Sequence, residues 1–99
     1  MLKITNDASK FQAEDECVVY FTAEWCGPCK QLKPQYGRVA TMDTKTNYYM
    51  VDVDKMGSST IEYYSLKGIP KIFKMKNGDI VEEIKSRTAE SILKELGKE

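Results

Sequence analysis

The run CVVYFT, residues 17–22, constrains the fold more than any other stretch of this 99-residue chain. Its residues are β-branched, aromatic or small and apolar, and no polar residue alternates with them. A strand with one face in water alternates apolar and polar side chains, so this run predicts a strand that is buried on both faces. Such a strand requires layers of structure on both sides of its sheet.

Other segments predict further strands. Residues 48–53 form a second candidate for a central strand, and Lys3-Ile4 can begin a short strand near the N-terminus. Residues 71–75 and 80–84 flank Asn77-Gly78, and this dipeptide between two apolar runs is the strongest short signal for a β-hairpin. The chain therefore predicts a sheet that ends in a hairpin.

Two helices are predicted in the first half of the chain. Asn6 or Asp7 can cap a short helix that carries Phe11. A longer helix starts at Pro28, and Pro34 predicts a kink inside it, because proline lacks the N–H and clashes with the preceding turn. The apolar residues of this helix follow one face: Cys29, Leu32, Tyr36, Val39 and Ala40.

Two more helices are predicted in the second half. Residues 57–66 carry Ile61 and Tyr64 at helical spacing, and Thr88 can cap a last helix. The apolar positions of that last helix suit one face packed on a sheet: Ala89, Ile92, Leu93 and Leu96. The order β-α-β-α-β-α-β-β-α predicts one α/β domain over residues 1–99, with a mixed central sheet and helices on both faces.

The charge balance and hydropathy exclude several classes of function. Fifteen Lys and Arg residues balance fifteen Asp and Glu residues, so the chain has no basic field for nucleic acid. No apolar run approaches the roughly 20 residues of a membrane span, and the first residues lack the apolar core of a signal peptide. We expect a soluble, cytoplasmic monomer with neither nucleic acid nor a membrane as its partner.

The chain has three cysteines, Cys17, Cys26 and Cys29, and no histidine. An odd number of cysteines does not favour a framework of structural disulfides, because one thiol is left without a partner. Structural zinc sites and iron–sulfur clusters need four Cys or His ligands, so we expect no metal. In a reducing compartment, a pair as close as Cys26 and Cys29 favours catalysis. Cys17 is expected to pack as a small buried hydrophobe, with a regulatory thiol as the alternative.

The two close cysteines stand where a strand gives way to a helix. The first turn of a helix presents unpaired N–H groups and a partial positive charge, which stabilise a thiolate at Cys26. In an ideal helix the Cα atom of Cys29 lies roughly 5 Å from that of Cys26, which a disulfide tolerates. Pro28 suits a helix start, and Gly27 lets another chain approach the sulfur. The motif predicts a redox dithiol, with Cys26 exposed and Cys29 behind it.

The same stretch resembles the active-site signature of the thioredoxin family. The resemblance extends over nearly the whole chain, in order and spacing, and rests on these residues: Trp25-Cys26-Gly27-Pro28-Cys29-Lys30, Pro34, Asp54, Gly68-Ile69-Pro70 and Asn77-Gly78. It implies a thioredoxin-like three-layer fold and a protein-disulfide reductase that needs no bound cofactor. Cys26 would attack a substrate disulfide, and Cys29 would then attack Cys26 and release the reduced substrate. A thioredoxin reductase, fed by NADPH, would reduce the resulting Cys26–Cys29 disulfide.

The resemblance also implies a substrate-binding surface. Pro70 would be cis and lie beside the sulfurs, and Ile69 would offer its backbone to a substrate strand. Asp54 would support the site. An apolar docking surface around Cys26 would comprise Trp25, Gly27, Pro28, Val53, Gly68 and Ile84. Val53 and Ile84 can equally be ordinary core residues.

Five positions depart from the family pattern. Tyr20 stands where many thioredoxins carry a buried Asp that assists deprotonation of the second cysteine, so Glu24 or water is left as the proton acceptor. The other departures are Met50 for a Lys, Thr22 for an aromatic residue, Lys71 for the Thr after the cis-proline, and Lys85 for a rim glycine. Lys71 and Lys85 add positive charge, which predicts a lower pKa for the Cys26 thiol and a preference for acidic or unusual substrates.

Three other functions share parts of this pattern. A same-fold isomerase or oxidant would show a reduction potential near about −180 mV, the value of protein disulfide isomerase, whereas thioredoxin itself lies near about −270 mV. A binding module or a subunit of a larger complex would use the docking surface without redox turnover. A glutaredoxin is disfavoured, because that family usually carries an aromatic or polar residue where Gly27-Pro28 stands.

Overall fold

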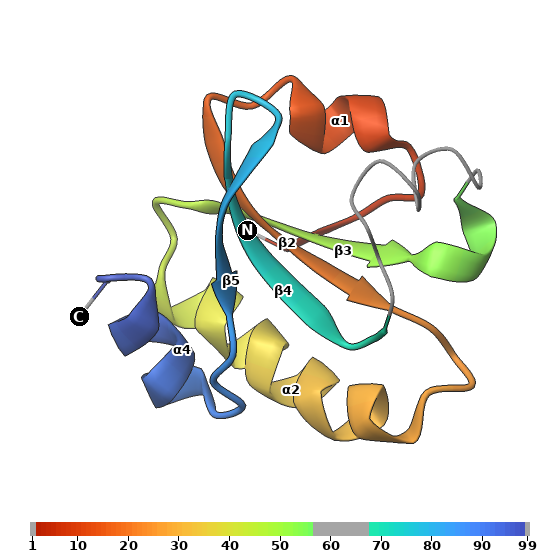
Figure 1. Ribbon diagram of the computed structural model, residues 1–99. Coiled ribbons are helices and arrows are strands. Elements are labelled where there is room, and N and C mark those ends of the chain that lie inside the picture. The colour runs from red at the N-terminus through yellow and green to blue at the C-terminus, as the bar shows by residue number, and fades with distance from the viewer. Residues whose placement is uncertain (1, 57–67, 99) are drawn as a thin grey trace.

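The computed structural model describes residues 2–56 and 68–98, and five strands in these ranges form one mixed sheet (Figure 1). The strands are β1 (Leu2–Ile4), β2 (Glu16–Thr22), β3 (Asn47–Asp52), β4 (Lys71–Lys76) and β5 (Asp79–Ile84). Their order across the sheet is β1-β3-β2-β4-β5. Strands β1 and β2 run parallel to β3, whereas β4 is antiparallel to both β2 and β5. The predicted mixed sheet is confirmed.

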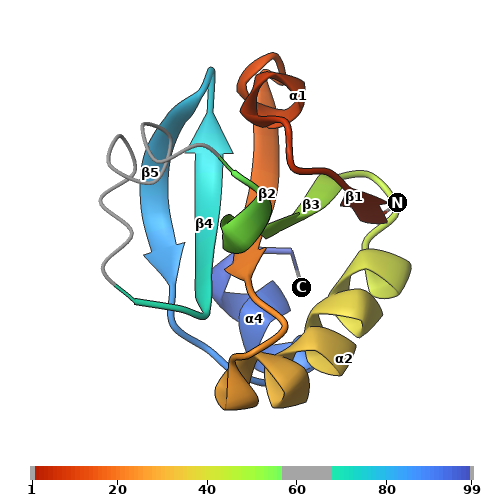
Figure 2. The same ribbon diagram turned by 90° about the vertical axis from the view of Figure 1, so that its right-hand side faces the viewer.

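Helices cover both faces of the sheet, as predicted. The described helices are α1 (Ala8–Gln12), α2 (Gly27–Met42), the short 3-10 helix η1 (Val53–Lys55) and α4 (Ala89–Glu95). Helix α1 lies on one face, and α2 and α4 lie together on the other (Figures 1 and 2). Of the two candidate caps for α1, Asp7 is the one used, because its carboxylate accepts the N–H of Ser9. The helix expected over residues 57–66 lies outside the described residues.

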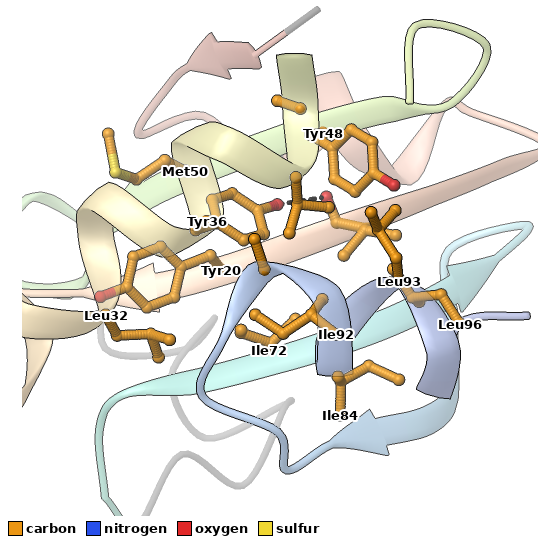
Figure 3. Packing of buried hydrophobic residues seen from close by; sticks show 14 residues of the cluster. Tyr20, Leu32, Tyr36, Tyr48, Met50, Ile72, Ile84, Ile92, Leu93 and Leu96 are labelled. Carbon is orange, nitrogen blue, oxygen red and sulfur yellow. Dashed lines mark hydrogen bonds between the residues drawn. The ribbon is translucent and has the colours of Figure 1, made fainter. Parts of the chain in front are cut away.

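Strand β2 is buried on both faces, which confirms the interpretation of its apolar run. Its side chains alternate between two core clusters. Val18 and Tyr20 pack in the cluster under α2 and α4, and this cluster is drawn in Figure 3. Cys17, Val19 and Phe21 pack in the other cluster with Phe11 of α1: the second cluster comprises Phe11, Cys17, Val19, Phe21, Tyr49, Val51, Phe73 and Met75. Contacts in both clusters therefore hold β2 between α1 on one face of the sheet and α2 and α4 on the other.

Tyr36 fixes helix α2 on the sheet. Its side chain is fully buried in the cluster of Figure 3. Its hydroxyl lies 2.8 Å from the carbonyl oxygen of Tyr49 and 3.1 Å from that of Val18. The Tyr36 hydroxyl thus donates toward carbonyls of two neighbouring strands. Its ring also packs on Tyr20 and Tyr48, with centroid distances of 4.9 and 5.8 Å. These contacts set the position and rotation of α2 over β2 and β3.

The hairpin between β4 and β5 forms where Asn77-Gly78 predicted it. Both residues adopt the left-handed backbone region, with φ of 52° and 84°, which a two-residue turn matched to the sheet twist requires. Lys74 pairs with Glu82 and Met75 with Ile80, so Val81 is the extra residue of a bulge. The bulge lies in β5, which forms one edge of the sheet.

We predict that Tyr36→Phe lowers the free energy of unfolding by about 1–3 kcal/mol, because two buried carbonyls lose a polar partner while the ring contacts remain. Tyr48→Phe is the matched control. The Tyr48 hydroxyl donates to the carboxylate of Asp43 at a partly buried site, where water can replace it. Urea unfolding of both variants checks the difference, and an equal loss in the two would contradict this role for Tyr36.

Candidate active site

Cys26 and Cys29 stand at the start of α2, directly beyond the carboxyl end of β2. Cys26 is the N-cap of the helix, and its sulfur accepts the N–H of Cys29 at 3.2 Å. The two cysteines are joined in a disulfide, with their Cα atoms 5.2 Å apart. Pro28 lies in the first turn, where its missing N–H has no intrahelical partner. The N–H that points at Cys26 Sγ is the contact that would stabilise a thiolate there.

The exposure of Cys26 differs from the expectation. Cys26 is only 4% exposed and Cys29 1%, so both are covered. The cover comes from Ala23, which packs with the two cysteines, and from the partly buried Val53 and Ile69. The family resemblance placed Val53 and Ile69 near Cys26, but the cysteine motif alone could not show that they cover its sulfur, because they come from distant parts of the chain. Little of the Cys26 side chain is therefore in contact with solvent in the disulfide form.

Trp25 and Asp54 lie beside the disulfide as a pair. Trp25 is 68% exposed, and its indole N–H donates to the carboxylate of Asp54 at 2.7 Å. Asp54 belongs to η1, and Asp52 is the N-cap of that short helix. The carboxylate of Asp52 accepts the backbone N–H of Asp54 at 2.9 Å. A short chain of hydrogen bonds thus holds a large apolar ring at the surface next to Cys26.

The segment before β4 faces the same sulfur. The Ile69–Pro70 peptide bond is cis, which confirms the prediction for Pro70. Cys26 Sγ lies 3.9 Å from the carbonyl oxygen of Ile69. Gly27 and Gly68 are exposed, and a Cβ atom at either would meet nothing within 4 Å. Ile84 is 3% exposed and packs in the cluster under α2 and α4, so it offers a partner little surface.

Tyr20 does not act in the manner of a carboxylate. It is fully buried, and its hydroxyl donates to the carbonyl oxygen of Cys29 at 3.0 Å. Burial raises the pKa of Tyr20, so the hydroxyl stays protonated in the neutral range. Tyr20 therefore holds the first turn of α2 on β2 as a hydrogen-bond donor.

Lys71 carries a charge that is partly balanced. Its ammonium lies 3.3 Å from the carboxylate of Glu83 across the β4–β5 pair, and both side chains are about one third exposed. Lys85 is exposed, and its backbone N–H donates to Glu95 at 3.1 Å. The positive charge that the sequence suggested beside the sulfurs is thus offset at Lys71 by a neighbour on β5.

The described part of the chain contains no group of three or more His, Cys, Asp or Glu residues that could hold a metal ion. Within residues 2–56 and 68–98, no helix combines the length and the apolar character needed to cross a membrane.

The comparison with known proteins agrees with the geometry of the dithiol. The thioredoxin family model matches residues 3–98. The chain belongs to the thioredoxin family. It is 34% identical over 88 residues to Thioredoxin-1 of Schizosaccharomyces pombe, and this alignment covers 85% of this chain and 84% of that protein. It is also 34% identical over 100 residues to Thioredoxin 1 of Plasmodium falciparum, over 97% of this chain and 94% of that protein.

The solved structures give the same result for the fold. The oxidised thioredoxin from Plasmodium falciparum superposes with a TM-score of 0.80 at 29% identity, over 99% of this chain and 97% of that chain. The chain is therefore a protein thiol-disulfide oxidoreductase, with a redox-active cysteine pair and disulfide-bearing proteins as substrates. Thioredoxins perform this chemistry without a prosthetic group.

Sequence reasoning missed several residues around the thioredoxin dithiol. Lys33, Asp52 and Lys55 line a cavity that also touches Cys29, although they come from three different elements. Asp52 could have been found from the sequence, because it is a polar residue inside the apolar run at residues 48–53. The lysines could not have been found in this way, because exposed lysines occur along the whole chain.

We predict that Cys17, the third cysteine, is inert in the folded protein. It is 1% exposed, and burial together with Glu14 and Glu16 raises the pKa of its thiol to about 11, from 9.0. At pH 8 this leaves about a hundredfold less thiolate than an ordinary thiol has. With the Cys26–Cys29 disulfide intact, iodoacetamide should therefore label Cys17 at least about a hundredfold faster after unfolding in urea than before. Fast, stoichiometric labelling of the folded protein would refute this prediction.

Proposed function

We propose that this thioredoxin-family chain works as a single domain that reduces protein disulfides, with Cys26 as the nucleophile and Cys29 as the resolving thiol. The observation that carries the assignment is the N–H of Cys29 directed at Cys26 Sγ at the start of α2. That N–H and the positive end of the helix favour a thiolate at Cys26. Cys29 lacks this help, because its own sulfur lies one turn further into the helix.

The proposed cycle moves two electrons. The Cys26 thiolate attacks one sulfur of a substrate disulfide, forms a mixed disulfide and expels the other sulfur as a thiolate, which takes up a proton. Cys29 then loses its proton and attacks Cys26 Sγ. The bond between Cys26 and the substrate breaks, and the second substrate thiolate leaves and is protonated. The substrate is reduced to two thiols, and the Cys26–Cys29 disulfide is the oxidised product.

We propose that the substrate docks around Cys26 as an added strand. Trp25 next to Cys26 exposes its ring, and the carbonyl oxygen of Ile69 in the cis Ile69–Pro70 segment lies 3.9 Å from Cys26 Sγ. Backbone groups of Ile69 would pair with an extended substrate segment. The proposed docking residues are Trp25, Gly27, Pro28, Val53, Gly68, Ile69 and Pro70, with Asp54 holding Trp25 in place.

The electron source is part of the proposal. A thioredoxin reductase, supplied by NADPH, would return the disulfide to the dithiol. We propose that the chain works in the cytoplasm as a monomer, and the free, buried thiol of Cys17 suits a reducing compartment of this kind.

A second candidate is a binding module that uses the same docking surface without turnover. Tyr20 favours it, because a hydroxyl that donates to the carbonyl of Cys29 does not take the proton that Cys29 must lose. In that case a variant with both Cys26→Ser and Cys29→Ser would keep the biological activity of the protein.

We expect the chain to catalyse reduction of insulin when it is coupled to NADPH and a thioredoxin reductase. Cys26→Ser should abolish turnover, because no nucleophile remains. Cys29→Ser should stall as a mixed disulfide with the substrate, visible as a species that dithiothreitol releases. Cys17→Ser is the matched control and should leave turnover unchanged. Full turnover in Cys26→Ser would disprove the assigned role.

We predict that Lys71→Thr raises the apparent pKa of the Cys26 thiol. The substitution removes a cation and leaves Glu83 unpaired, and both changes disfavour a nearby thiolate. Lys74→Thr is the control, since Lys74 lies on the same strand and also faces a carboxylate, that of Glu16 at 3.9 Å. The thiolate absorbance of the reduced proteins, followed against pH, gives the two values. An unchanged pKa in Lys71→Thr would eliminate this residue as a tuning charge.

A further inference from the structure

A cavity of about 470 Å³ opens beside the dithiol. Cys29 forms part of its wall, together with Thr22 and Ala23 at the end of β2 and with Met50 and Asp52 of β3. The remaining lining residues are exposed and form the rim: Ile4, Glu24, Lys30, Lys33 and Lys55. One water molecule occupies about 30 Å³ in the liquid. The cavity therefore has room for several water molecules or for a small dissolved base.

The cavity is separate from the proposed docking surface. None of the proposed docking residues lines it. A substrate bound over Cys26, Trp25 and Pro70 would therefore leave the cavity open to solvent. Cys29 is the residue that connects the two sides, since its sulfur is bonded to Cys26 and the residue forms part of the cavity wall.

Three departures from the family pattern meet at this cavity. Thr22 is small where an aromatic residue is usual, and Met50 stands where a Lys is usual; both line the cavity. Tyr20, which stands at the usual Asp position, does not line it and donates to the carbonyl of Cys29 instead. Among the described residues no Asp or Glu is buried, since Thr46 is the one buried polar residue there. The described residues thus offer open space at Cys29 where a buried carboxylate would serve as the base.

Cys29 needs a proton acceptor at one step. When Cys26 is bonded to the substrate, Cys29 must become a thiolate before it attacks Cys26 Sγ. We propose that the cavity is the route by which Cys29 gives up this proton, with water or a small dissolved base as the acceptor. The proton passes from Cys29 Sγ to the acceptor, the electron pair of the sulfur forms the bond to Cys26 Sγ, and the substrate sulfur leaves. This inference rests on the function proposed above.

The charges around the cavity favour this route for anionic bases. Lys30 and Lys33 of α2 and Lys55 of η1 lie at the rim, and cations near a thiol stabilise the thiolate. Glu24 and Asp52 oppose them with two negative charges, so the lysines leave one positive charge in excess. A base such as the phosphate dianion is therefore attracted to the cavity, where it can accept a proton.

The consequence is general-base catalysis by the buffer, restricted to one step. The reduced protein is mixed with 5,5′-dithiobis(2-nitrobenzoate), and the coloured thiol is followed by stopped flow. Attack by Cys26 releases the first equivalent, and attack by Cys29 on the mixed disulfide releases the second. At fixed pH and ionic strength, we expect the second rate constant to rise linearly with phosphate concentration while the first stays constant. A second rate constant that does not respond to phosphate would overturn the proposal.

A pair of variants at Thr22 tests the cavity itself. Thr22→Phe fills it, and Thr22→Val keeps its size while removing the hydroxyl. We expect Thr22→Phe to slow the second step roughly tenfold or more and to lose the phosphate response, since positioned proton transfer contributes about 10²–10⁴-fold. Thr22→Val should keep both. Circular dichroism checks that each variant folds, and if Thr22→Phe does not fold, the phosphate response of the unaltered protein decides. An unchanged phosphate response in a folded Thr22→Phe would refute the route.

The assay separates this inference from the proposed function. The chromogenic disulfide is small and needs no protein docking, so it reports on Cys29 whether or not insulin is reduced. Failure of insulin reduction with a normal phosphate response would count against the proposed function and support the cavity route.

Discussion

The attachment of α2 to the sheet determines where both cysteines stand. The buried hydroxyl of Tyr36 donates toward carbonyls of β2 and β3, and Tyr20 of β2 donates to the carbonyl of Cys29 in the first turn of the helix. Two tyrosines, one in the helix and one in the sheet, therefore fix α2 at its middle and at its start. Because Cys26 caps this helix, the direction of the N–H that reaches its sulfur follows from these bonds.

Most of the fold could be predicted from the sequence, because single stretches of the chain specify its main elements. The run at residues 17–22 had no polar alternation, and only a strand covered on both faces satisfies that pattern. Asn77-Gly78 specified the hairpin, because few other residue pairs adopt two successive left-handed conformations. The bulge at Val81 was not predicted, since it depends on how β4 and β5 align and not on either strand alone.

The site was predictable where it is local in sequence and unpredictable where distant elements meet. Cys26, Pro28 and Cys29 are close neighbours, so helix geometry was enough to place them. The cover over Cys26 and the cavity beside Cys29 arise from β2, β3, η1 and the segment before β4, which meet only in three dimensions. The role of Tyr20 also needed the three-dimensional structure, because a predicted buried strand does not show which buried group the hydroxyl contacts.

The bulge in β5 has a consequence for association between copies of this chain. If a substrate docks beside Pro70 as an extended segment, as proposed above, the chain is also exposed to the risk of accepting its own edge strand. Strand β5 presents Ile80 and Val81 to solvent, and a regular apolar edge of this kind would invite pairing. The extra residue Val81 interrupts the regular spacing of edge hydrogen bonds, and Glu82 and Glu83 would face like charges in a paired copy. The irregular edge thus disfavours pairing between the β5 strands of two copies.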